Sequence, residues 1–126
     1  MIRQQFFVEH YWKVIVYWNV DYNFFDSITK ELEENDLDLD DIKEIYQNMS
    51  TRKAKAVTCS NIRKHTSIVL FNMHDSFTDY LNSVVHEAEH IKQAMLKTYH
   101  VKDRGEVPAY TIGYLVGKMW KILKIL

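Results

Sequence analysis

A chain of 126 residues has the length of one ordinary domain, and 47% of its residues are apolar, which is enough to bury a core without disulfides or metals. Its 16 basic and 17 acidic residues leave a net charge of −1, so no overall field attracts nucleic acid or an anionic membrane. We therefore expect a single domain over residues 1–126 that binds neither nucleic acid nor membrane.

The cysteine content and the hydropathy of the chain indicate in which cellular compartment the protein resides. Cys59 is the only cysteine, which excludes an internal disulfide and is typical of a reducing compartment. Val107–Leu126 contains Gly113-x-x-x-Gly117, a spacing found in membrane-helix dimers, but three lysines interrupt the apolar run. The sequence thus favours a cytoplasmic protein without a membrane span.

The first predicted element is a strand over Phe6–Trp18. Its residues alternate between apolar and polar, which indicates one buried face. His10 falls on the apolar face, where a hydrogen-bonded core histidine is a better interpretation than a metal ligand.

Two helices are expected next, over Tyr22–Glu34 and Asp40–Met49, because apolar residues recur there at helical spacing. The acidic residues between them resemble the start of a calcium loop. However, Asp41 stands at the sixth position of a loop starting at Asp36, where a calcium loop requires Gly. Capping of the second helix explains these acids better.

The remaining elements are a hairpin and two helices. Ala54–Cys59 and Thr66–Asn72 are predicted strands, followed by a helix from Asp75 or Ser76 to about Tyr99 and a last helix from about Gly105 towards the C-terminus. The expected fold is α+β. In it, three mostly antiparallel strands, including Phe6–Trp18, pack against the last two helices, with the acidic helical hairpin at one side.

The segment that indicates chemistry is His86-Glu87-Ala88-Glu89-His90, within the long predicted helix. Residues four apart lie one turn above each other, so both imidazoles can reach one zinc ion, and Glu87 lies beside them to accept a proton. At 100° per residue both histidines point away from the apolar stripe of this helix. The alternative is a solvated helix face without metal.

A third zinc ligand is expected from the last helix. Glu106, Gly113 and Gly117 point in nearly one direction, with Ala109 and Tyr110 flanking them, and the small side chains there would let another backbone approach closely. The carboxylate of Glu106 would then lie where two helices almost touch. The alternative is a seam of small residues with Glu106 merely exposed in the first turn.

Other candidates for the third ligand are His74, His100 and Asp103. His100 lies ten residues beyond His90, about 15 Å along a helix axis, and Asp103 suits a helix cap. His74 precedes the motif helix on the wrong side for a short side chain. Glu106 is therefore preferred.

These residues resemble the gluzincin branch of zinc metallopeptidases, whose best-known members are thermolysin-like; the resemblance covers residues 72–126. It implies zinc bound by His86, His90 and Glu106, with Glu87 as general base. It also implies that the strand before the motif helix, here Thr66–Asn72, forms the edge of the substrate cleft. Glu89 differs from the family, which has an uncharged residue at that place.

Related enzyme classes fit less well. The metzincin motif requires Gly and His where this chain has Gln93 and Leu96. Peptide deformylases take a cysteine ligand upstream, but Cys59 lacks the expected neighbours. A di-iron bundle needs a second Glu-x-x-His pair, which is absent.

The expected function is a zinc-dependent peptidase that hydrolyses a peptide or related amide bond. Tyr110 would either donate a hydrogen bond to the oxyanion or, as we favour, pack as an interfacial aromatic on the motif helix.

The alternative to a peptidase is a non-catalytic interaction module, or a degenerate relative with structural or no zinc. In that case the three tryptophans, eight tyrosines and the apolar Ile122–Leu126 tail serve partner binding. The tail would also allow a homodimer through the last helix.

Overall fold

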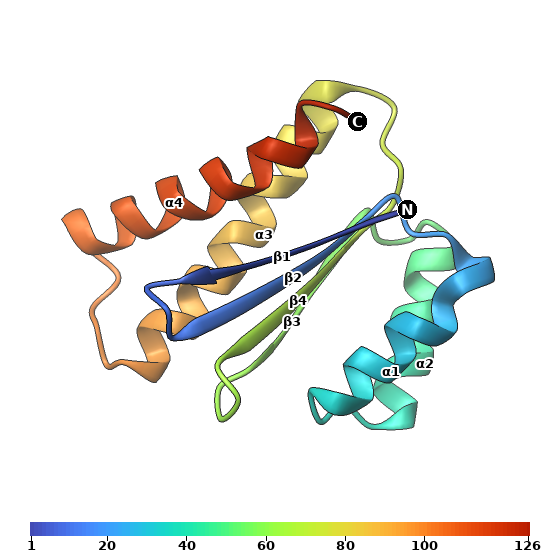
Figure 1. Cartoon of the computed structure of the whole chain (residues 1–126), viewed down its shortest axis with the longest axis horizontal. Coiled ribbons are helices and arrows are strands. Elements are labelled where there is room, and N and C mark those ends of the chain that lie inside the picture. The colour runs from blue at the N-terminus through green and yellow to red at the C-terminus, as the bar shows by residue number, and fades with distance from the viewer.

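The computed structural model describes residues 1–126 as a four-stranded sheet with helices on both faces, which confirms the α+β class (Figure 1). The helices are too short or too polar to cross a bilayer. The elements are β1 (Ile2–Val8), β2 (Trp12–Trp18), a 3₁₀ turn (Tyr22–Phe24), α1 (Phe25–Glu34), α2 (Leu39–Ser50), β3 (Ala56–Asn61), β4 (Thr66–Phe71), α3 (Phe77–Thr98) and α4 (Glu106–Leu123).

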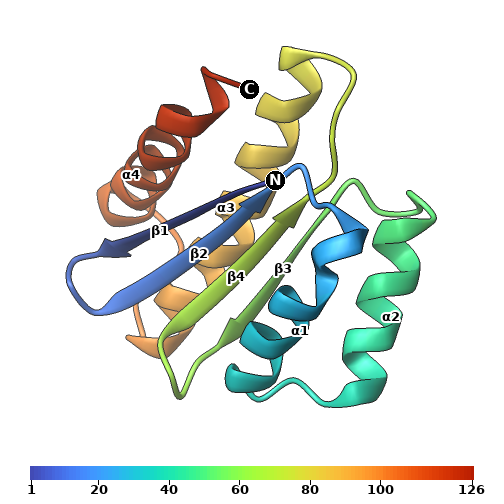
Figure 2. The ribbon, with the colours of Figure 1, turned by 45° about the vertical axis from the view of Figure 1, so that its right-hand side comes forward.

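The sheet has the strand order β1-β2-β4-β3 (Figure 2). β1 and β2 are antiparallel, as are β3 and β4, but β2 and β4 run parallel at the centre. The expected number of three strands is therefore wrong, because there are four. Two of the three strand pairings are antiparallel, in line with a mostly antiparallel sheet, but the central pairing is parallel. A parallel pair needs a long connection, which α1, α2 and β3 provide here.

The single long strand predicted over Phe6–Trp18 is a hairpin, β1–β2. Val8 pairs with Trp12, and Glu9 and His10 turn the chain with positive φ angles of 55° and 63°. Paired residues of an antiparallel hairpin face the same side, and Val8 and Trp12 are an even number of residues apart, so the alternation continues unbroken through the turn. For this reason periodicity could not reveal the reversal. His10 is exposed in the turn, not buried on the apolar face.

Each face of the sheet has its own core. One lies beneath α3 and α4 and is built from the even-numbered residues of β1 and β2, including Trp12 and Trp18. The other lies beneath α1 and α2 around Ile28 and Leu32. The predicted helical hairpin is confirmed, and the Asp38 side chain caps α2 by accepting from the Asp41 N–H at 2.8 Å.

Close packing at the glycines of α4 is not observed. The buried residues of α4 are Pro108, Leu115, Met119 and Leu123. A Cβ atom added at Gly113 or Gly117 would meet no atom within 4 Å. The prediction of a helix contact along the small residues is therefore wrong: larger apolar side chains bury more surface and determine which side of α4 faces the core.

Candidate metal centre

His86 and His90 lie one turn apart on α3, which the Ser76 side chain caps at its N-terminus. Their Nε2 atoms are 3.2 Å apart. The His86 side chain is 70% exposed, and neither ring belongs to the core beneath α3. The prediction that both histidines lie off the apolar stripe is confirmed.

The spacing of the two nitrogens fits a shared zinc ion. Zinc binds histidine nitrogen at about 2.0–2.1 Å in tetrahedral geometry, which places two such nitrogens about 3.3 Å apart. The observed 3.2 Å between the Nε2 atoms is close to this value, and it is also the length of a hydrogen bond between the two rings, whose planes are 80° apart. The pair therefore fits two of the positions that a zinc ion would offer.

Glu87 lies beside the pair and is buried, with 5% of its surface exposed. Its Oε1 accepts a hydrogen bond from the Thr58 hydroxyl on β3 at 2.9 Å, and its Oε2 lies 3.9 Å from Nε2 of His86. One oxygen is thus held by the sheet while the other faces the histidines. Thr58 was not identified from the sequence, because only the packing of α3 on β3 joins two residues 29 positions apart.

A cavity of about 350 Å³ opens along this part of the molecule, between α3 and β3, and is lined in part by Thr58, His86, Glu87 and His90. β3 is an edge strand, whereas β4 is fully buried between β2 and β3. The expectation that Thr66–Asn72 forms the edge of the cleft is therefore wrong. The sequence correctly predicted that these two strands form a hairpin, but it did not show which of them lies at the edge of the sheet.

Glu106 is not near this pair. It is the exposed first residue of α4, and α4 lies over β1, whereas α3 lies over β3 and β4 (Figure 2). No three side chains of His, Cys, Asp or Glu gather in a way that could hold a metal ion. The structure brings together two predicted ligands and the predicted base, but not the third ligand.

The other candidate ligands are engaged or exposed elsewhere. The ring nitrogens of His74 contact the Asn72 carbonyl oxygen at 2.6 Å and the Ser83 hydroxyl at 2.7 Å. His100 is exposed just past the end of α3. Tyr110 is 74% exposed and lines a different cavity, so its ring is not buried against α3.

Glu89, where the family resemblance would place an uncharged residue, has a contact of its own. It binds the Lys92 ammonium at 2.7 Å, and Lys92 also binds Asp103 at 2.8 Å in the connection between α3 and α4. Burial lowers the pKa of Lys92, but the hydrogen bonds to Asp103 and Glu89 outweigh this effect and raise it. Lys92 thus joins α3 to the α3–α4 connection, and Glu89 helps to hold the Lys92 ammonium in place.

Comparison of the chain with protein-family models, with curated proteins and with solved structures finds no match. The local arrangement combines two imidazoles whose Nε2 atoms are 3.2 Å apart, a buried carboxylate beside them and an open strand edge. Two imidazoles are two ligands of the kind that zinc binds, and a carboxylate beside them is a group that can accept a proton.

Proposed function

We propose that this chain is a cytoplasmic zinc-dependent peptidase in which His86 and His90 hold the metal and Glu87 is the general base. The main support for the proposal is that the two Nε2 atoms lie 3.2 Å apart beside the buried carboxylate of Glu87. A buried carboxylate whose free oxygen faces two imidazoles has no evident role in packing.

The chain's own residues would act as follows. Zinc, when bound, polarises the substrate carbonyl and lowers the pKa of a water molecule. Glu87 accepts a proton at Oε2, because Oε1 is already held by the Thr58 hydroxyl. Since Thr58 belongs to the sheet and Glu87 to α3, the carboxylate is fixed from two elements and does not depend on one side-chain rotamer.

The substrate class follows from the open edge of β3. The Lys55 carbonyl oxygen accepts from the Asn72 N–H at 3.0 Å, and antiparallel hydrogen bonding alternates along a strand. The backbone groups of Ala56, Thr58 and Ser60 therefore point away from β4. An extended peptide can pair with them and would run past His86 and His90.

Removal of metal is expected to abolish hydrolysis. Protein treated with a chelator should lose at least 99% of its activity on a mixed peptide library, and one equivalent of zinc should restore it, since the water is activated by the ion. Mass spectrometry of the library measures both. Undiminished cleavage by metal-free protein would contradict the proposal.

Glu106 is our proposed third ligand, carried by the resemblance to gluzincins, and would require the first turn of α4 to approach α3. We expect Glu106→Ala to weaken zinc binding at least tenfold, because a protein carboxylate is lost from the coordination shell. His100→Ala and Asp103→Ala are the matched controls and should change affinity little. Competition with a chromogenic chelator measures all three; wild-type affinity in Glu106→Ala would remove the gluzincin assignment while leaving the histidine pair in place.

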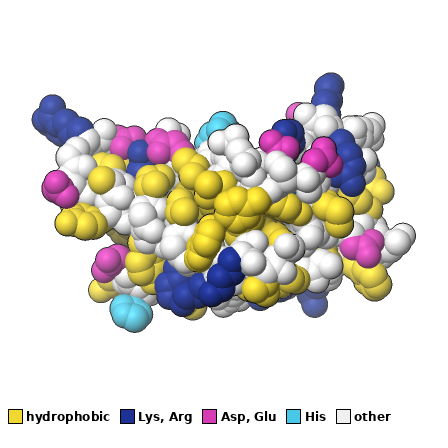
Figure 3. Space-filling view, turned by 90° about the horizontal axis from the view of Figure 1, so that it is seen from above, with side chains coloured by type: hydrophobic (Ala, Val, Ile, Leu, Met, Phe, Trp, Pro, Cys, Tyr) yellow, Lys and Arg dark blue, Asp and Glu magenta, His cyan; other side chains and the backbone are white.

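A second candidate function is an interaction module that pairs two copies of the chain through α4. The outer side of α4 is apolar, with Val107, Tyr110 and Trp120 all well exposed, and Figure 3 shows hydrophobic side chains in a band across this surface. Near the N-terminal half of α4 lies a groove of about 960 Å³ with Gly113 in its wall. Protein that lacks zinc yet self-associates would favour this interpretation.

A further inference from the structure

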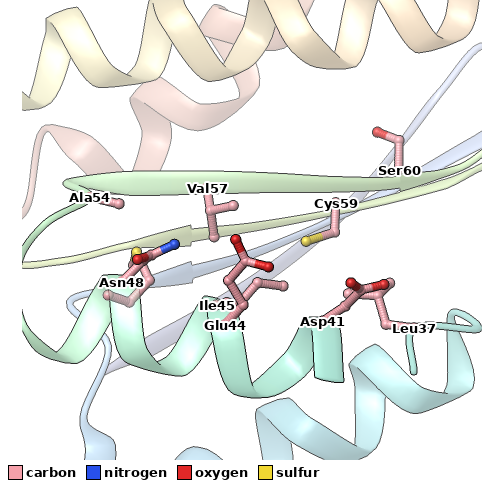
Figure 4. Close-up of a pocket in the computed structure, with 10 residues that line it drawn as sticks. Leu37, Asp41, Glu44, Ile45, Asn48, Ala54, Val57, Cys59 and Ser60 are labelled. Atoms are coloured by element: carbon pink, nitrogen blue, oxygen red, sulfur yellow. The ribbon is translucent and has the colours of Figure 1, made fainter. Parts of the chain in front are cut away.

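A second cavity lies on the opposite face of β3 from the histidine pair. Side chains of a strand alternate between faces, so Thr58 points to α3 while Val57 and Cys59 point to α2. Figure 4 shows Val57 and Cys59 directed from β3 into the space above α2. The same strand edge therefore borders both the candidate metal centre and this second cavity.

The cavity has an apolar floor and an acidic rim. Its volume is about 360 Å³, and six of its ten lining residues are hydrophobic. Asp41 and Glu44, on the exposed side of α2, extend their carboxylates towards β3 (Figure 4). Long cationic side chains suit this combination, because an aliphatic stem covers apolar surface while the charged end remains at the rim.

Neither carboxylate forms an ion pair within the chain. The ion pairs of the chain involve Glu31, Asp36, Glu87, Glu89 and Asp103, but not Asp41 or Glu44. Burial, followed by the charges of Asp41 and Glu87, raises the pKa of the Cys59 thiol to about 11. The thiol therefore stays neutral near pH 7 and adds no charge to the rim.

We infer that this cavity is a specificity pocket that takes a Lys or Arg side chain of the peptide substrate. The inference rests on the proposed function, because it assumes a peptide paired with the edge of β3. In such a peptide, the residue opposite Thr58 faces the histidines, and its neighbours, opposite Val57 and Cys59, face Asp41 and Glu44. The basic residue therefore lies next to the residue at the metal centre.

The test uses binding and cleavage side by side. Peptide binding is measured by fluorescence anisotropy with the zinc-loaded Glu87→Gln variant, which should bind peptide without cleaving it. The labelled peptides share a neutral sequence and carry one Lys at successive positions. For each of them, a control peptide carries norleucine in place of Lys. We expect Lys at one position to bind about tenfold more tightly than norleucine, and less so at high salt, since both carboxylates are exposed. With wild-type protein, the cleaved bond should lie beside that Lys.

The decisive variant is Asp41→Asn/Glu44→Gln, which should lose the preference for Lys and bind both peptides alike. Its matched control, Asp26→Asn/Glu33→Gln, removes the same charge from the exposed surface of α1 and should keep the preference. Two results would contradict the specificity pocket, even if peptides are cleaved. One is equal binding of the Lys and norleucine peptides by Glu87→Gln protein that retains Asp41 and Glu44. The other is an unchanged preference for Lys in the Asp41→Asn/Glu44→Gln variant. A preference that depends on Asp41 and Glu44, without cleavage by zinc-loaded wild type, would keep the pocket and refute the peptidase.

Discussion

Replacing Glu87 with Gln is expected to reduce hydrolysis about a thousandfold while leaving zinc content unchanged. An amide has nearly the same shape as a carboxylate but cannot accept a proton, and general-base catalysis is worth about 10² to 10⁴ in rate. Because Glu87 is buried with only Thr58 as its hydrogen-bond donor, Gln can still accept that bond through its carbonyl oxygen and the fold should persist. Steady-state kinetics with zinc analysis of the same samples measures the effect.

Thr58 supplies the control for this experiment. Thr58→Val keeps the shape of the side chain but removes the donor to Glu87, so kcat should fall about tenfold with KM nearly unchanged, and Thr58→Ser should restore it. Equal kcat in wild type and Glu87→Gln would show that Glu87 is not the base. Equal loss in the Ser and Val variants would show that Thr58 acts through packing alone.

His86→Ala and His90→Ala are each expected to abolish both zinc binding and hydrolysis. Each substitution removes one of the two imidazole nitrogens that lie 3.2 Å apart, and a single imidazole does not hold zinc in competition with a chelator. Thermal stability of the metal-free protein should change little, because surface substitutions usually stay within about 0.5 kcal/mol.

Competition titration with a chelator measures this loss, and circular dichroism establishes that the fold persists. His10→Ala is the matched control, since His10 is exposed in the β1–β2 turn far along the chain from the motif. Zinc affinity retained by both motif variants, or lost equally in His10→Ala, would contradict the assignment.

The sequence predicted the helices better than the sheet. Helical spacing and capping residues are local. The start of α3 was expected at Asp75 or Ser76, and Ser76 is its cap; α2 was expected from about Asp40 and begins at Leu39 after the cap Asp38. Strand number and pairing are not local: the hairpin at Glu9 and His10 kept the alternation in phase, and nothing in the spacing showed that β2 and β4 would pair in parallel.

In the candidate site, too, the residues that are close in sequence were predictable, whereas contacts between different elements were not. His86, Glu87 and His90 form one local pattern, and their relative placement follows from helix geometry. Thr58 lies in another element and became visible only through the packing of α3 on β3. For Glu106, small residues suggested a close approach, but larger apolar side chains turn the opposite side of α4 towards the core.

The central claim is that this chain binds one zinc ion through His86 and His90. Elemental analysis of wild-type protein purified without added metal, and again after dialysis against zinc and removal of excess ion, tests it most directly. We expect one zinc per chain, bound tightly enough to survive gel filtration. Wild-type protein that carries no transition metal even after the zinc dialysis would contradict it.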